Sequence, residues 1–454
     1  MSGSMKRLAL VALVPIFTLG CERQPVTPVT GGPDSGQSHQ GPVGETDAGV
    51  DAGSDAGTDT GTDAGTDAGT DAGGLTWYRD VLPIVQENCQ ACHVAGGLAP
   101  FALTTYQDAF VRHALLADAV STRRMPPWLP DDGCVSLKGS RRLSTAEIDV
   151  FVLWSQAGAP AGDPADAPAP LTAAPGLPRV DATLEPVDSY VPNSAVTDDY
   201  RCFVLPPAYT AQTATNLIGF EVVPGTPQQV HHVILFAAPA VAAQDKDTQE
   251  AGPGWTCYGG PNIPNTNPKM LGGWAPGTGV TLYPVDTGIQ LQDGEAIVMQ
   301  VHYNTSNGPP VADRTRVKLE YAPSVTYPAT IVPVMDDQFA IPPLTSGYVH
   351  YSDQLLPGLP FLSFRLWGVG PHMHQLGRRI RAIRNPTTMQ QCLIDIPQWD
   401  FHWQQTYQYT MPISVAGGDT VRIECTWDNP TSASVTWGEG TADEMCIAFF
   451  YMTL

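Results

Sequence analysis

Basic residues are scarce in this chain of 454 residues: Lys and Arg number 23 against 45 Asp and Glu, which gives a formal net charge of -22. Nucleic-acid binding is therefore not expected, because phosphates need Lys and Arg for neutralisation. Charged residues make up only 15%, and no internal run reaches the roughly 18 apolar residues of a membrane-spanning helix. Gly (44) and Pro (43) are frequent, and hydrophobic residues reach 43%. This composition excludes wholesale disorder and favours a loop-rich, β-rich protein of about three domains.

The N-terminus predicts export. Residues 1–21 combine a short basic stretch with the apolar run Leu8–Leu19, which is too short to span a membrane, and they end at Gly20 and Cys21. A small residue followed by Cys after such a run is typical of a bacterial lipoprotein signal peptide, which would leave Cys21 lipidated. An ordinary secretory signal cut nearby is the alternative. Either way we expect export and permissible disulfides. With lipidation, the protein is attached to the membrane by its lipid anchor only, facing the periplasm or the cell surface.

Two low-complexity segments separate the parts of the chain. In residues 22–74 an Asp recurs at every fourth position from Asp47 to Asp71. Gly and like charges keep such a segment extended, so we expect a disordered tether. A calcium-binding repeat is the alternative, but the alternating oxygen ligands of calcium loops are missing. Residues 161–179 are rich in Ala and Pro and predict a second, stiffer linker.

Residues 75–160 have the pattern of a small helical domain. Ser144 and Glu147 have the spacing of a capping box, and apolar residues follow at helical intervals. Within this segment Cys89-Gln90-Ala91-Cys92-His93 matches the attachment sequence of c-type haem. The thiols of Cys89 and Cys92 would bind the two vinyl groups, and the imidazole of His93 would ligate the iron. A redox Cys-x-x-Cys pair and half of a zinc site are the alternatives, and neither needs the His.

Met125 is the expected second axial ligand of the haem. It lies in Arg123-Arg124-Met125-Pro126-Pro127-Trp128, and His113 is the competing candidate. A Met held by prolines after a helix is similar to the sixth-ligand loop of small class I cytochromes c. Residues 75–160 therefore resemble an all-α cytochrome c domain with covalent haem c.

From about residue 180 onward the pattern changes to strands. Short alternating runs separated by Pro, Gly and Asn lie at residues 219–223, 296–303, 317–321 and 421–427. This spacing predicts antiparallel β-sandwiches and not a parallel sheet. We expect an N-terminal sandwich at 180–335 and a C-terminal one at 336–454.

Five histidines are candidate metal ligands. In the His-x-His sequence at 372–374 both imidazoles would share one face of a strand, because side chains alternate with a period of two. His231 and His232 would point to opposite faces of a regular strand, so both can reach one metal only at a strand end or a bulge. His302 lies on the polar face of an apolar strand, where a hydrogen-bonded structural His is the alternative to a third ligand.

These motifs together resemble the copper type II, ascorbate-dependent monooxygenases, which include peptidylglycine α-hydroxylating and dopamine β-monooxygenases. The resemblance rests on four sequences in the same order: His-His-Val-Ile-Leu-Phe, Gln-Val-His-Tyr, His-x-His-x-x-Gly and Asp-Glu-Met-Cys. The intervals 232–302, 302–372 and 374–445 also agree with the family. The resemblance covers roughly residues 200–454, in a jelly-roll-like pair of sandwiches.

The resemblance implies two copper ions, one per sandwich, on either side of a solvent-filled cleft. The electron-storing copper would be bound by His231, His232 and His302. The oxygen-activating copper would be bound by the candidate catalytic residues His372, His374 and Met445. A soft thioether favours Cu(I), the state that meets dioxygen, whereas imidazoles accept both oxidation states. A packed core residue is the alternative for the Met.

Nine cysteines are present, and six remain after the lipid and haem candidates, enough for up to three disulfides. The family implies a disulfide between Cys425 and Cys446 beside the Met ligand. Arg314 stands where the family has a Cys, so Cys202 needs another partner, for which we expect Cys257 by elimination. The two cysteines left unassigned are Cys134 and Cys392.

The chain departs from the family at the substrate positions. Peptide-hydroxylating members bind a substrate carboxylate with an Arg two residues before the His-x-His and a Tyr four residues after the Met. Here these positions hold Gly370 and Phe449, so no cation is presented and a C-terminal peptide is not the expected substrate. No amine-binding carboxylate is evident either, and the aromatic run at 449–451 suggests an apolar pocket.

We therefore expect a copper-dependent monooxygenase that hydroxylates a C–H bond of a small organic substrate with O2, two electrons and two protons, giving an alcohol and water. The electrons would come through the fused haem from a periplasmic donor, or from ascorbate. The alternative class is a non-catalytic surface lipoprotein that binds haem and copper for electron transfer or copper binding.

Overall fold

The computed structural model describes residues 74–95, 99–171, 176–206, 215–276, 278–306, 308–356, 363–401, 403–438, 440 and 442–454. The predicted signal peptide with Cys21, and all but the last residue of the predicted tether, lie outside the described residues. The described residues belong to one compact unit. Among their helices, none has the length and apolar character needed to cross a membrane.

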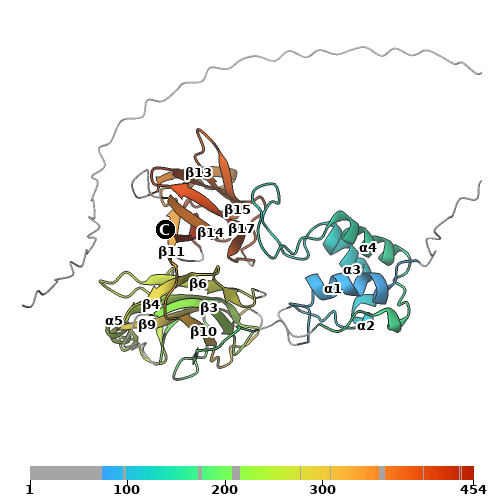
Figure 1. Ribbon diagram of the computed structural model, residues 1–454, viewed down its shortest axis with the longest axis horizontal. Helices are drawn as coiled ribbons and strands as arrows, with labels where there is room; N and C mark the ends of the chain where they lie inside the picture. The colour runs from blue at the N-terminus through green and yellow to red at the C-terminus, as the bar shows by residue number, and fades with distance from the viewer. Residues whose placement is uncertain are drawn as a thin grey trace, which may run out of the picture. The chain divides into compact units, whose positions relative to one another are not determined.

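The segment that follows residue 74 is helical, as its sequence pattern predicts. It contains η1 (Trp77–Val81), α1 (Leu82–Asn88), α2 (Tyr106–Phe110), α3 (His113–Ser121) and α4 (Thr145–Gln156) (Figure 1). Helix α4 begins at the predicted capping box: Ser144 Oγ accepts from the Glu147 N–H, and the Glu147 carboxylate accepts from the Ser144 N–H. Its buried face contributes Phe151 and Trp154 to a core that it shares with Trp77.

The chain between α3 and α4 runs onto the β-sheet part of the molecule. Trp128 lies in the core of the C-terminal sandwich and packs edge-on against Tyr407, with ring centroids 5.4 Å apart. A disulfide joins Cys134 to Cys392 across 258 residues of sequence. These two cysteines are the pair that sequence reasoning left unassigned. The helical segment is therefore covalently connected to the second sandwich at a point other than its own C-terminal linker, which contains η2 (Pro164–Asp166).

The N-terminal sandwich is built on a five-stranded sheet. Its order is β5 (Trp255–Thr256), β2 (Asp198–Leu205), β9 (Glu295–Asn304), β4 (Val230–Pro239) and β6 (Lys269–Trp274), and α5 (Ala240–Asp247) follows β4. The facing strands are β1 (Ala182–Leu184), β10 (Arg316–Ala322), β3 (Thr215–Val223), β7 (Thr281–Leu282) and β8 (Thr287–Leu291). Alternating apolar side chains of the two layers, such as Leu217, Leu235 and Met299, are fully buried between them.

The second layer of this sandwich continues into the C-terminal half. Beyond β8 the same sheet adds β11 (Tyr327–Met335), β20 (Ile447–Thr453), β14 (Ser363–His372) and β17 (Tyr407–Ala416). Strand β11 pairs in parallel with β8 and antiparallel with β20, so the boundary expected at residue 335 falls at the end of a strand that both halves share. The second layer of the C-terminal sandwich is β13 (Thr345–Leu355), β18 (Thr420–Asn429), β15 (Gly377–Arg384) and β16 (Gln391–Ile396), and β12 (Ala340–Ile341) pairs with β19 (Val435–Thr436).

Candidate metal centres

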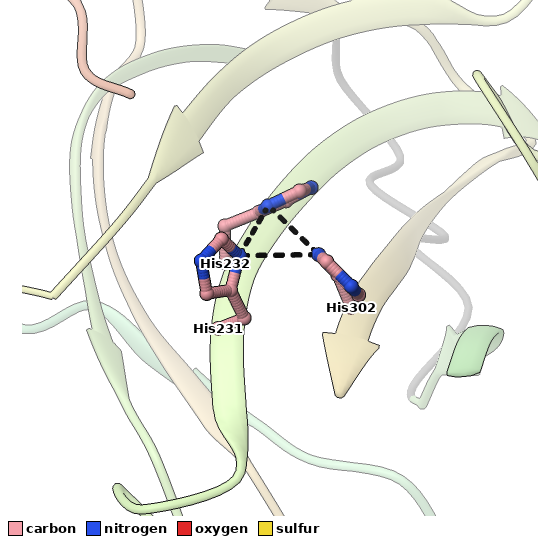
Figure 2. Close-up of side chains that lie close together, drawn as sticks. All are labelled: His231, His232 and His302. Carbon is pink, nitrogen blue, oxygen red and sulfur yellow. Dashed lines mark hydrogen bonds between the residues drawn. The ribbon is translucent and has the colours of Figure 1, made fainter. Parts of the chain in front are cut away.

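Three histidines bring ring nitrogens together where β4 and β9 pair (Figure 2). Nδ1 of His231 lies 3.3 Å from Nδ1 of His232 and 3.1 Å from Nδ1 of His302, and the remaining pair is separated by 3.3 Å. The ladder between the two strands is irregular between Val230 and His232. This irregularity is the bulge that two adjacent histidines need in order to face one point.

The spacing of the three nitrogens fits a single metal ion. Ligand nitrogens about 2.0–2.1 Å from a metal, at tetrahedral angles, lie about 3.3 Å from one another. Burial, reinforced by the neighbouring imidazoles, holds the pKa of His232 and of His302 well below the usual value of 6.5. The rings are therefore neutral, which is the form that binds metals.

Asp198 and Tyr200 set the orientation of the most buried of these rings. Nε2–H of His302 donates to the Asp198 carboxylate at 2.9 Å, which leaves Nδ1 directed at the other two histidines. The ring of Tyr200 stacks on His302 with centroids 4.1 Å apart and planes 6° apart. Neither neighbour was identified from the sequence, although a carboxylate and an aromatic residue at the start of a strand beside a histidine strand are a usable signal.

A second histidine pair lies at the end of β14. The rings of His372 and His374 are 5.1 Å apart, nearly perpendicular. Here the Nδ1 atoms are engaged: His372 donates to Gln404 Oε1 at 2.5 Å, and His374 donates to the Asp443 carbonyl at 3.0 Å. Nε2 is then the nitrogen that each ring offers to a metal. Burial lowers the pKa of His372 to about 3 and also lowers that of His374, so both rings are neutral.

Met445 is buried and lines the same cavity as this pair. Its neighbour Glu444 is fully buried, and its carboxylate accepts hydrogen bonds from the backbone N–H of His374 at 3.0 Å and of Met445 at 3.3 Å. Leu376 N–H and Trp427 Nε1–H also donate to it. Burial raises the pKa of Glu444 to about 7. One side chain thus positions the backbone of both predicted ligand segments, a role that sequence reasoning did not assign.

Phe401 connects the two histidine groups. Its buried ring lies 6.0 Å from His231, with planes 21° apart, and 6.2 Å from His374, nearly perpendicular. It comes from the loop after β16, and Gln404 Nε2–H donates to its carbonyl at 2.9 Å. No periodic pattern marks a loop residue of this kind, so only the tertiary structure identifies it.

Two disulfides lie within the sandwiches that contain these histidines. Cys425 and Cys446 are bonded, and the pair joins β18 to the residue after Met445. Cys202 and Cys257 are bonded as well, beside the five-stranded sheet. Both pairs are the ones expected from the sequence.

The haem-attachment sequence lies at the end of α1. Cys89 and Cys92 are not disulfide-bonded, and burial raises the pKa of Cys89 to about 12 and also raises that of Cys92. Activated redox cysteines show the opposite shift, so these two thiols do not resemble an activated redox pair. Nδ1–H of His93 donates to the Phe101 carbonyl at 3.0 Å, so Nε2 is the nitrogen that would ligate the iron of a bound haem.

The two candidates for the second axial ligand differ in their surroundings. Met125 lines a small cavity with Val120 and Leu143. The Nδ1 atom of His113 forms a 2.8 Å hydrogen bond with Ser155 Oγ, and its ring packs edge-on against Trp154. His113 is thus hydrogen-bonded through Nδ1 in the same way as His93, and Met125 and His113 both stay candidates for the second haem ligand.

Two linked β-sandwiches present histidines to one cavity, His232 from the first and His372 and His374 from the second. The family model "copper type II ascorbate-dependent monooxygenase, N-terminal domain" matches residues 186–309, and the model of the C-terminal domain matches residues 329–453. Together they cover more than half of the chain. This protein therefore belongs to the copper type II ascorbate-dependent monooxygenase family.

Individual relatives are similar over the same region. The chain is 26% identical over 286 residues to DBH-like monooxygenase protein 2 of Mus musculus, covering 58% of this chain and 45% of that protein. It is 24% identical over 283 residues to tyramine beta-hydroxylase of Caenorhabditis briggsae, covering 58% and 46%. The chain thus spans about half the length of the curated relatives it matches. Among solved structures, PNGase F of Flavobacterium meningosepticum aligns with a TM-score of 0.28 at 10% identity, covering 60% of this chain and 95% of that one.

Proposed function

We propose that the protein is a copper-dependent monooxygenase that hydroxylates a C–H bond of a small organic substrate with O2. The observation that carries the proposal is the opposite use of ring nitrogens in the two halves. His231, His232 and His302 converge through Nδ1, whereas His372 and His374 have Nδ1 engaged and present Nε2. Two different sets of candidate donors, in a family that uses copper, support a reaction that needs two distinct metal centres.

Copper bound at these centres would supply oxygen activation at the His372 side and one-electron transfer at the His231 side. The protein's own residues hold this arrangement. Asp198 keeps the proton on Nε2 of His302, and Gln404 fixes the tautomer of His372. The ring of Phe401 lies within ring-contact distance of both His231 and His374 and so connects the two histidine groups. Because burial lowers the pKa of His232, His302, His372 and His374, these four imidazoles are in the neutral form that binds metals.

The test is copper stoichiometry followed by coupled turnover. We expect two copper ions per chain, and O2 uptake that requires both a reductant and substrate and yields the alcohol in equal amount. His372→Ala, with the fold verified by circular dichroism, is expected to lose one copper and all hydroxylation. Two bound coppers without product under any reductant would instead favour the non-catalytic electron-transfer protein.

We further propose that the helical segment is a haem c domain that passes electrons to the copper centres, with ascorbate as the alternative reductant. The guanidinium of Arg141 supports this assignment. It acts electrostatically on the thiol of Cys92, and its Nη2–H donates to Gln405 Oε1 at 3.0 Å. Gln405 lines the metal cavity and directly follows Gln404, the partner of His372. Arg141 thus lies within electrostatic range of the predicted haem-attachment sequence and is hydrogen-bonded to a residue of the cavity wall.

The proposed electron relay requires that covalent haem is present and that turnover with a protein donor depends on it. Covalent haem should be present at one per chain, in the pyridine haemochrome assay, and absent in Cys92→Ala. The same variant should retain turnover with ascorbate and lose turnover with a reduced periplasmic cytochrome as donor. Full turnover of Cys92→Ala with that donor would exclude the relay.

We also propose that Cys21 is lipidated. Mass spectrometry of the membrane fraction tests this proposal, and the variant Cys21→Ser, which should be released from the membrane, is the control.

A further inference from the structure

A cavity of about 380 Å³ lies against the two histidine groups and is lined by residues of both sandwiches. His232, His372, His374 and Met445 all contribute to its wall. Its volume is within the range of roughly 300–1,000 Å³ found for pockets that take small organic ligands. This cavity is therefore where a substrate would meet the predicted oxygen-activating side.

The wall away from the histidines is apolar. Strands β11 and β20 line it with three pairs of residues that lie directly opposite one another in the ladder: Ile331 and Tyr451, Pro333 and Phe449, Met335 and Ile447. These are alternate positions along each strand, so they share one face of the sheet. Trp274, Trp367 and Tyr283 add further aromatic surface. Such a surface gains free energy by covering an apolar or aromatic group.

Charge is missing from the cavity. None of the described residues that line it is an Asp, Glu, Lys or Arg. Its polar groups are neutral amides and hydroxyls, among them Gln300, Gln405 and Thr406. Glu444, the nearest carboxylate in sequence to the ligands, already accepts four N–H groups behind the wall. A ligand with a full charge would lose its hydration here without gaining an ionic partner.

Gly370 occupies a position on the cavity wall where the chain has no charged side chain. It pairs with Phe449 in the ladder between β14 and β20 and lies two residues before His372. A Cβ added there would meet only Thr406 Oγ1 at 3.3 Å and Phe449 Cβ at 4.0 Å. Neighbouring Gly368 has no such room, because its Cβ would lie 2.7 Å from the Tyr407 carbonyl oxygen. The backbone therefore accepts a side chain at 370, and glycine leaves this part of the wall open and uncharged.

We propose that the cavity selects neutral substrates with an apolar, aromatic-sized body, and that it discriminates against both ammonium and carboxylate compounds. Hydroxylation of such substrates rests on the proposed function. The binding preference does not, because it depends only on the residues that line the cavity. A neutral hydroxyl, carbonyl or amide on the substrate would find its hydrogen-bond partners among the glutamines and threonines.

The test is equilibrium binding to the copper-free full-length protein. Isothermal titration calorimetry compares three probes with the same ring and chain length: hydrocinnamamide, hydrocinnamate and phenylpropylamine. We expect the neutral amide to bind at least about tenfold more tightly than either charged probe, a difference of about 1.4 kcal/mol. A charged probe that binds as tightly as the amide, or no binding of the amide, would overturn the proposal.

Two variants at one position sharpen the test. Gly370→Arg is expected to strengthen hydrocinnamate binding at least about tenfold. Gly370→Gln introduces an uncharged side chain of similar size, and it is expected to keep the preference for the amide unchanged. Turnover measurements distinguish this substrate proposal from the proposed monooxygenase function. Selective binding of the amide without any hydroxylation by the copper-loaded protein would contradict the monooxygenase alone. Coupled hydroxylation of phenylpropylamine in preference to the amide would contradict the substrate class alone.

Discussion

The Asp198 carboxylate accepts the Nε2 proton of His302 at 2.9 Å, and this contact decides which nitrogen of the imidazole faces His231 and His232. Carboxylate partners of this kind fix the ring orientation of metal-binding histidines and raise their basicity. In the other half of the molecule the amide of Gln404 acts on the opposite ring nitrogen of His372. The two centres therefore depend on different supporting residues and can be perturbed one at a time.

Asp198→Asn is expected to weaken copper binding at the centre of His231, His232 and His302 by about 10–100-fold, because the amide no longer holds the Nε2 proton as a carboxylate does. Chelator competition on the two-copper protein measures this loss, and one copper should remain tightly bound. The exposed Asp188→Asn serves as the matched control. An equal loss at both centres would contradict the assignment.

Gln404→Leu is expected to produce the complementary effect. Without the Oε1 acceptor, His372 can rotate or change tautomer, and copper affinity on the His372 side should fall by about 10–100-fold. The same competition assay reports it, with the tight copper now on the other side. Gln408→Leu, whose amide donates to the Leu282 carbonyl and not to a histidine, is the control and should bind two coppers normally.

Phe401→Leu should lower turnover without lowering the copper content. The substitution keeps an apolar side chain in the loop but removes the ring that contacts both His231 and His374. Small displacements of reacting groups can cost about 100-fold in rate. Steady-state O2 uptake and copper analysis on the same sample check the prediction. Phe236→Leu, in the satellite core of the N-terminal sandwich, should cost stability and leave turnover unchanged. A Phe401→Leu enzyme with wild-type turnover would remove any functional role for the ring.

Glu444→Gln is expected to destabilise the C-terminal sandwich by about 1–3 kcal/mol, because an amide group directed at buried N–H donors leaves at least one of them without an acceptor. Urea unfolding followed by tryptophan fluorescence measures the free energy of unfolding. The loss should be accompanied by weaker copper binding on the His374 side, since Glu444 holds the backbone of both His374 and Met445. Glu424→Gln, on the half-buried surface of β18, is the control and should change both quantities little.

Removing the disulfide between Cys134 and Cys392 by a double Ser substitution should free the segment around Trp128 from the sandwich. The loop it closes spans 258 residues, and chain-entropy reasoning puts the cost near or above the roughly 4.7 kcal/mol of a 100-residue loop. Hydrogen exchange at residues 128–138 should rise strongly. The Cys202–Cys257 pair, with a separation of 55, is the comparison, and its removal should leave exchange at 128–138 unchanged.

Much of the candidate site was predictable because it depends on local chemistry. The need for a bulge at His231 and His232 follows from strand alternation, and the ladder is irregular at that place. The capping box of Ser144 and Glu147 is likewise a matter of spacing and side-chain type. The family motifs predicted the histidines and Met445 together, because the order of the motifs along the chain can be recognised without knowledge of the fold.

The sequence by itself determined the β-rich class, the histidine motifs and two of the three disulfide pairs of the described residues, and it predicts haem attachment at residues 89–93. Only the tertiary structure decided that Phe401 lies between two histidines more than a hundred residues apart, that Cys134 meets Cys392, and that one sheet continues through both sandwiches. It also decided that the cavity wall is free of charge among its described residues. The physical reason is that these contacts join loops and sheet faces distant in sequence, and such contacts depend on how whole layers pack and leave no periodic pattern along the chain.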